Sequence, residues 1–239
     1  MGVVSKGLSA MVLAGVVAVA NASDEGAAVR AALQRAIPGM EPDRVVAAPT
    51  PGWYEVAYGT EIFYVSADGR YLLQGDLIDL QTQRNLTEDR RSAARADLVK
   101  TIDPADAIIF KPKRTRYVVY VFTDVDCTYC RKMHSEISEY LGEGIEIRYL
   151  AFPRSGLNTP SYFKAVSVWC AADRGAALTE AKAGRPVAEK TCKNPVRHEM
   201  ELAAKVGVDG TPTLLFPDGE VVPGYVSADH LRRLLDRGG

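Results

Sequence analysis

The chain has 239 residues, of which 47% are hydrophobic and 25% are charged, so it can bury ordinary hydrophobic cores. Its formal net charge of −1 gives no electrostatic basis for binding nucleic acid or an anionic membrane. We therefore expect a protein without a nucleic-acid partner. We also expect no cofactor.

The first 22 residues have the pattern of an export signal. Lys6 supplies a positive charge, an uncharged apolar run covers residues 8–20, and Ala20-Asn21-Ala22 has the form of an A-x-A cleavage site. The run is shorter than the ~20 apolar residues that a membrane span needs, and no stop-transfer charges follow it. We expect residues 1–22 to be removed, leaving an exported chain that starts at Ser23 and has no membrane anchor.

Residues 23–86 are predicted to form one helix followed by a small antiparallel sheet. Apolar residues recur every four positions within 23–37, which is the spacing of one helix face. Alternating patterns around an Asp68-Gly69 turn signal then indicate hairpin strands at 53–58, 61–65, 70–74 and 76–80. Such a small domain without cysteines is marginal alone, so pairing with a second copy through a late edge strand and packing on its own chain both remain open.

Residues 87–102 are predicted to form a solvated connecting helix with Thr87 as its N-cap. The second domain, residues 103–239, has the element order of a thioredoxin fold with a helical insertion at 160–193. Its expected elements are a strand at 117–123, a helix at 127–141, a strand at 145–152, the insertion, a helix at 195–206, strands at 213–216 and 220–222, and a helix at 228–236.

The motif Cys127-Thr128-Tyr129-Cys130 follows an apolar strand pattern and opens a predicted helix, which is the setting of a redox-active C-x-x-C pair. A helix N-terminus lowers the pKa of a thiol placed there. We therefore expect Cys127 to be the exposed nucleophile and Cys130 to be the more buried, resolving thiol. Asp124 would oppose the acidity of Cys127 if it lies close by, unless it caps the helix instead.

The four cysteines allow three disulfide pairings. We expect Cys170 and Cys192 to form a structural bridge, because only that pairing leaves the C-x-x-C pair free to cycle. A purely structural C-x-x-C bridge and a zinc site are the alternatives, but the spacing to the later Cys and His residues matches no zinc-finger pattern, so we expect no metal. His134 shares a helix face with the motif and could tune the thiols, although packing or surface exposure is the favoured interpretation.

Thr211-Pro212 stands directly before a predicted strand. A cis bond there would bring the Thr211 backbone beside Cys127, where it could pair with an extended substrate chain. A trans proline is usual at a strand start, so the sequence leaves the isomer open.

Several segments resemble those of the bacterial periplasmic disulfide isomerases of the DsbC/DsbG type. They are residues 122–134, 148–157 and 206–212, together with Gln74-Gly75, Trp169-Cys170 and Val222-Pro223-Gly224-Tyr225. The resemblance covers nearly the whole chain. It implies a small cystatin-like N-terminal dimerisation domain, a linker helix and a thioredoxin-like catalytic domain.

The resemblance also implies a V-shaped periplasmic homodimer whose two C-x-x-C sites face a shared apolar cleft. In it Cys127 attacks, Cys130 resolves, and Thr211 with Pro212 forms a cis-proline loop. The expected function is isomerisation and reduction of non-native disulfides in misfolded exported proteins, with chaperone activity, and with a membrane thiol reductase of the DsbD type as electron donor. The alternatives are a periplasmic chaperone, a sulfenic-acid or disulfide reductase of the DsbG type and, less favoured, a dithiol oxidase.

Overall fold

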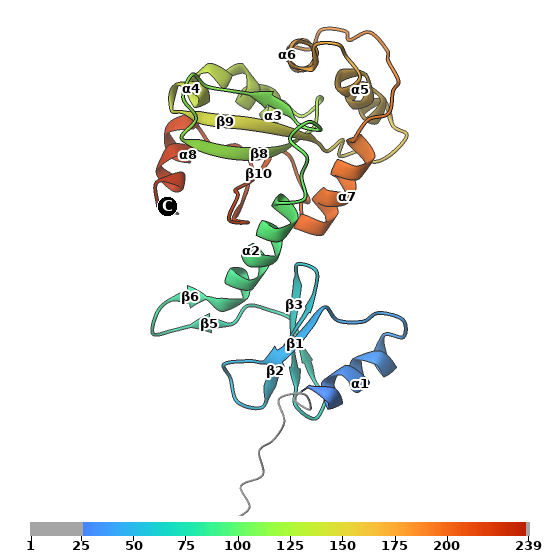
Figure 1. Ribbon diagram of the computed structural model, residues 1–239, viewed down its shortest axis with the longest axis vertical. Coiled ribbons are helices and arrows are strands. Elements are labelled where there is room, and N and C mark those ends of the chain that lie inside the picture. The colour runs from blue at the N-terminus through green and yellow to red at the C-terminus, as the bar shows by residue number, and fades with distance from the viewer. Residues whose placement is uncertain (1–25, 238–239) are drawn as a thin grey trace, which may run out of the picture.

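The computed structural model describes residues 26–237, which form two domains joined by a helix (Figure 1). The predicted export signal lies outside these residues. Within the described part of the chain, no helix combines the length and the apolar character that crossing a membrane requires.

The N-terminal domain is a four-stranded antiparallel sheet with the order β1-β2-β3-β4, packed against the helix α1 (Ala27–Ala36). The strands are β1 (Arg44–Ala47), β2 (Trp53–Tyr58), β3 (Glu61–Ser66) and β4 (Leu72–Leu73). Val29 and Leu33 of the helix face predicted from the four-residue spacing are buried, whereas Ile37, the third residue of that predicted face, lies beyond the end of the helix and is 40% exposed. The apolar cluster between helix and sheet consists of Val29, Leu33, Val45, Val56 and Val65.

The connecting helix α2 (Leu86–Val99) follows a short ribbon of β5 (Ile78–Asp79) and β6 (Arg84–Asn85). Its N-cap is Asn85, whose side chain accepts a hydrogen bond from the Glu88 N–H at 2.9 Å. The prediction that Thr87 caps this helix was wrong. The Thr87 hydroxyl is buried and already engaged, because it bonds the Tyr64 hydroxyl at 2.5 Å and accepts from the Leu77 N–H at 2.8 Å.

Helix α2 is less solvated than predicted, because it lies against the second domain. Arg95 Nε donates to the Val206 carbonyl oxygen at 3.0 Å. Gly219, in the turn between the last two strands, comes so close that a Cβ atom there would lie 1.9 Å from the Ser92 carbonyl oxygen. The backbone of the two elements is therefore in direct contact, and only glycine fits at this turn.

The second domain is built on a five-stranded sheet with the order β11-β10-β8-β9-β7. Its strands are β7 (Ile108–Phe110), β8 (Tyr117–Thr123), β9 (Ile145–Ala151), β10 (Thr213–Leu215) and β11 (Val221–Pro223). The central pair β8 and β9 is parallel, and the other pairings are antiparallel. Strand β7 was not predicted from the sequence, because its apolar stretch is short.

Six helices complete the described part of this domain: α3 (Thr128–Ser135), α4 (Ile137–Gly142), α5 (Pro160–Trp169), α6 (Arg174–Lys182), α7 (Val196–Val206) and α8 (Ala228–Leu235). The single helix predicted over 127–141 is two helices that meet at Glu136, whose φ of −101° and ψ of 15° are not helical. The insertion is helical only as far as Lys182. Figure 1 shows α5 and α6 together at one end of the sheet, with α4 and α8 at the other.

Candidate active site

Strand β8 and helix α3 place the C-x-x-C pair. The strand is buried from Val119 to Thr123, so the sheet core fixes the point at which the chain turns into the motif. Cys127 is the N-cap of α3, and its Sγ accepts a hydrogen bond from the Cys130 N–H at 3.4 Å. The Cys127 sulfur therefore lies at the positive end of a helix, which favours its anion.

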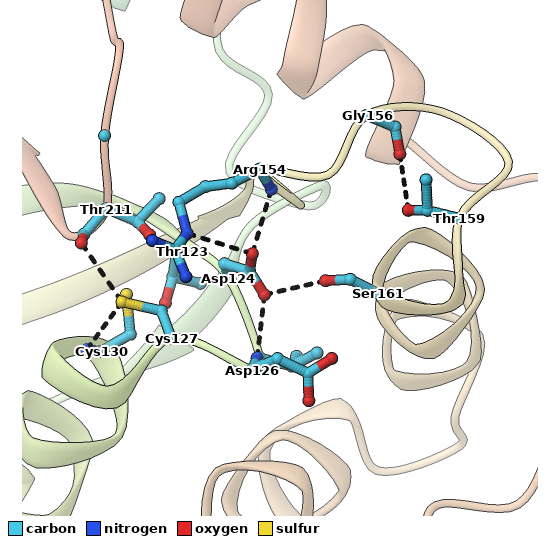
Figure 2. Close-up of polar contacts among 12 residues, drawn as sticks. Thr123, Asp124, Asp126, Cys127, Cys130, Arg154, Gly156, Thr159, Ser161 and Thr211 are labelled. Atoms are coloured by element: carbon cyan, nitrogen blue, oxygen red, sulfur yellow. Dashed lines mark hydrogen bonds and ion pairs between the residues drawn. The ribbon is translucent and has the colours of Figure 1, made fainter.

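The Thr211–Pro212 peptide bond is cis, and this loop lies against the motif (Figure 2). The Cys127 thiol donates to the Thr211 carbonyl oxygen at 3.2 Å. Only 3% of Cys127 and 1% of Cys130 is exposed. The prediction that Cys127 is exposed was therefore wrong, because a loop 84 positions away in the chain covers it.

The two thiols have opposite pKa shifts. Burial is the largest influence on the pKa of Cys127 and acts to raise it, but the Thr211 side chain and the Cys130 N–H, both donors toward the sulfur, outweigh burial and bring the pKa below its usual value. The buried Thr211 hydroxyl has no hydrogen-bond partner within residues 26–237, so it is free to donate to the Cys127 thiolate once that forms. Burial raises the pKa of Cys130. Cys127 is thus the thiol that ionises first.

Asp124 lies beside the motif without capping its helix. Its carboxylate accepts from the Asp126 N–H and the Ser161 hydroxyl, both at 2.8 Å, and from the Arg154 N–H at 3.0 Å (Figure 2). Burial acts to raise the pKa of Asp124, but these hydrogen bonds and the Arg154 charge hold the pKa below its usual value. Sequence reasoning gave no role to Arg154 or Ser161, which arrive from the loop after β9 and from α5.

His134 is buried among packed side chains. Its ring nitrogens lie 3.2 Å from the Tyr149 hydroxyl and 3.0 Å from the Thr179 hydroxyl. Burial, and then the charge of Lys182, lower the pKa of His134 to about 4. The ring is therefore neutral at physiological pH, and its hydrogen bonds go to Tyr149 and Thr179.

Cys170 and Cys192 form a disulfide with a Cα–Cα distance of 5.7 Å, while Cys127 and Cys130 are free thiols. Cys170 is the C-cap of α5, and Cys192 lies in the irregular segment between α6 and α7. The bridge ties this segment to the end of α5.

A cavity of about 530 Å³ opens beside the motif, between α5 and the segment that follows α6. Charged side chains of both signs line it, among them Asp126, Arg131 and Arg185, together with apolar ones such as Phe163. Phe163 is 52% exposed, and Tyr129 inside the motif is 62% exposed. The motif is thus flanked by accessible aromatic and charged surface that could contact a polypeptide.

Known proteins with similar sequences share both domains. Residues 20–88 match the family described as "Disulfide bond isomerase protein N-terminal domain", and residues 104–239 match "Thioredoxin-like domain". The thiol:disulfide interchange protein DsbC of Dickeya dadantii is 36% identical over 220 residues, which cover 91% of this chain and 89% of that protein. The DsbC of Escherichia coli K12 is 30% identical over 200 residues, or 83% of each chain.

A similar solved structure is that of a disulfide interchange protein from Neisseria gonorrhoeae. It has a TM-score of 0.51 and 29% identity, and the match covers 57% of this chain and 97% of that one. The resemblance stated from the sequence and the predicted combination of an N-terminal domain with a thioredoxin-like domain are confirmed. With a free thiol pair at a helix N-terminus of the second domain, the chain belongs to the DsbC family of thiol:disulfide interchange proteins.

Proposed function

We propose that this protein isomerises non-native disulfides in exported proteins, with Cys127 as the nucleophile and Cys130 as the resolving thiol. The observation that carries the proposal is the position of the Cys127 sulfur at the N-terminus of α3, where it accepts from the Cys130 N–H beside the Thr211 loop. The helix N-terminus favours the Cys127 thiolate, which is the form of cysteine that attacks a disulfide.

The reaction starts when the Cys127 thiolate attacks one sulfur of a substrate disulfide. A mixed disulfide forms, and the second substrate sulfur leaves as a thiolate with the electron pair. The Thr211 backbone beside Cys127 is positioned to pair with an extended substrate strand. If another substrate thiol then attacks the mixed disulfide, the substrate leaves with a new disulfide and no net oxidation or reduction.

Cys130 provides the second route by which the mixed disulfide is resolved. Its thiolate attacks the Cys127 sulfur, which closes a Cys127–Cys130 disulfide and releases a reduced substrate. Two electrons then have to be returned to the pair, and a membrane thiol reductase of the DsbD type is the proposed donor. The low exposure of Cys130 supports its assignment to this internal step rather than to the first attack.

The N-terminal domain is proposed to form a homodimer. Strand β4 is at the edge of its sheet, and the segment around it exposes Tyr71, Leu72 and Leu73 by 55%, 54% and 47%. An open edge with apolar side chains is suited to pairing with a second copy. We propose residues 23–86 as the dimerisation domain, 87–102 as the linker and 103–239 as the catalytic domain, in a periplasmic protein whose signal is residues 1–22.

A periplasmic chaperone is the second candidate, and exposed aromatic surface beside the motif favours it. Tyr129 and Phe163 offer contacts to unfolded chains that do not require a thiol. A variant carrying Cys127→Ala and Cys130→Ala tests this function alone. The chaperone function would be favoured if this variant still suppresses aggregation and the wild type shows no isomerase activity.

Reactivation of scrambled ribonuclease tests the proposed function. Wild type is expected to restore ribonuclease activity, Cys127→Ala to lose this ability, and Cys130→Ala to keep part of it, since a substrate thiol can still resolve the mixed disulfide. Equal reactivation by wild type and Cys127→Ala would contradict the assignment of the nucleophile.

A further inference from the structure

Lys182, the last residue of α6, is buried directly behind the thiol pair. Only 4% of it is exposed. Its Nζ donates to the Thr123 hydroxyl oxygen at 2.6 Å and to the Asp124 carbonyl oxygen at 2.8 Å. Both acceptor atoms are uncharged; Thr123 is the last residue of β8, and Asp124 follows it directly, where the chain enters the motif. A lysine is rarely buried without a carboxylate partner, because removing its charge from water is costly. The burial of Lys182 therefore suggests a functional role.

Thr123 links this lysine to the resolving thiol. The Thr123 hydroxyl accepts from Lys182 Nζ, and the same side chain lies close enough to Cys130 to lower the pKa of Cys130 against the effect of burial. Thr123 Oγ1 is therefore a neighbour of both Lys182 Nζ and Cys130 Sγ. Cys130 is 1% exposed, so bulk water has little access to its proton, and Thr123 offers an internal route for it.

We propose that Lys182 accepts the proton of Cys130, through the Thr123 hydroxyl, when Cys130 resolves a mixed disulfide. This inference rests on the proposed function of Cys130. Cys130 passes its proton to the Thr123 oxygen while the Thr123 hydroxyl passes its own to the neutral Lys182 amine. The Cys130 thiolate then attacks the Cys127 sulfur, the bond from Cys127 to the substrate sulfur breaks, and the electron pair leaves with the substrate thiolate. Lys182 later returns the proton to solvent.

The charges around Lys182 suit this role. Burial lowers the pKa of Lys182 to about 8, far enough for a neutral amine to be accessible near neutral pH. Nearby anions act in the other direction and raise this pKa, whereas Arg131 lowers it. In the mixed disulfide Cys127 carries no charge, so Lys182 loses one of the partners that favour its protonation. The groups that face Lys182 are Cys127, Cys130, Arg131 and His134 of α3 and Asp124 of the preceding loop.

Reaction of the reduced full-length protein with 5,5′-dithiobis(2-nitrobenzoate) separates the two steps. Attack by Cys127 releases a first coloured thionitrobenzoate and leaves the second as a mixed disulfide, which Cys130 then releases in a second phase. Lys182→Met is expected to keep the first phase within about twofold of wild type and to slow the second by roughly 10- to 100-fold. Lys132→Met, which removes a solvent-exposed lysine of α3, is the matched control and should change neither phase.

The pH profile identifies the role of Lys182 as a proton acceptor. In wild type the second-phase rate should level off above about pH 8, where Lys182 is neutral. In Lys182→Met the rate should keep rising with pH, because Cys130 must then ionise without help. Lys182→Arg keeps a positive charge that does not accept a proton, so it should be as slow as Lys182→Met. A wild-type rate in Lys182→Arg would make Lys182 a fixed cation and overturn the proposal.

Thr123→Val is a second test of the proton route that leaves Lys182 unchanged. It replaces the hydroxyl with a methyl group of similar size. It should slow the second phase as Lys182→Met does, and the double variant should be no slower than the slower single one. An unchanged second phase in Lys182→Met or in Thr123→Val, at every pH, would overturn the proposal. The first phase reports on Cys127 alone, so its absence in wild type would contradict the proposed function itself and with it this inference.

Discussion

The sulfur of Cys127 lies 3.2 Å from the carbonyl oxygen of Thr211, although the two residues are 84 positions apart in the chain. This contact joins the N-terminus of α3 to the loop before β10, and it buries a thiol that also has a lowered pKa. A buried thiol can still ionise here because the helix N-terminus and the Thr211 hydroxyl, which are both donors, replace the stabilisation that water would give to the thiolate.

The first prediction concerns the Thr211 hydroxyl. Thr211→Val should raise the pKa of Cys127, because it removes a donor to the thiolate while burial, which opposes ionisation, remains. Titration of the ultraviolet absorbance of the thiolate in Cys130→Ala protein measures this pKa. Thr211→Ser, which keeps the hydroxyl, is the control and should titrate like the parent protein. A Thr211→Val titration identical to the parent would show that the hydroxyl does not stabilise the thiolate.

The second prediction concerns Glu199, a buried residue of α7. One carboxylate oxygen accepts from the Ala151 N–H at 2.7 Å, the other has no partner within residues 26–237, and burial raises the pKa of Glu199 to about 8. The folded protein thus holds a proton that the unfolded chain releases at lower pH. The free energy of unfolding should fall as pH rises from about 4.5 to about 8.

Glu199→Gln should flatten this dependence, since glutamine does not titrate. Urea unfolding at a series of pH values measures it, and Glu201→Gln, on the exposed side of the same helix, is the control that should keep the wild-type slope. A Glu199→Gln protein with an unaltered slope would assign the pH dependence to other groups.

The third prediction tests the contact between α2 and the turn at Gly219. Gly219 and Gly207 have φ values of +87° and +85°, so alanine is strained at both, but only at Gly219 would its Cβ meet another element. Gly207→Ala should lower the free energy of unfolding by about 1 kcal/mol, the cost of placing a Cβ in the left-handed region. Gly219→Ala should lower it by roughly 2 kcal/mol or more, because the turn must also move away from Ser92. Equal decreases in the free energy of unfolding for the two variants, measured with urea, would mean that the turn can move away from α2 without an energetic cost.

The fourth prediction concerns the Cys170–Cys192 disulfide, whose sequence separation is 22 residues. Replacing both cysteines by alanine should lower the free energy of unfolding by roughly 3 kcal/mol, from the loop-closure entropy that the bridge removes from the unfolded chain. The first phase of the thionitrobenzoate reaction should persist in the folded variant. A variant as stable as the wild type would show that the bridge does not stabilise the fold.

Local sequence patterns predicted the features that depend on neighbouring residues. The strand before Cys127, the helix after it and the separation of the chain into two domains follow from apolar spacing and turn signals. The features that the sequence did not predict depend on contacts between distant segments. The loop at Thr211 covers Cys127, and Arg154 pairs with Asp124. Neither contact changes the spacing of apolar residues from which local structure is predicted. Lys182 was missed because a helical lysine is ordinarily a surface residue.

The most direct test of the account is to identify the cysteine that bonds covalently to a substrate. A mixed disulfide is trapped by mixing reduced Cys130→Ala protein with scrambled ribonuclease, and its peptides are mapped by mass spectrometry without reduction. We predict that the bond joins a ribonuclease cysteine to Cys127. Mapping of the bond to Cys170 or Cys192, or recovery of the same amount of complex from a Cys127→Ala/Cys130→Ala protein, would contradict the account.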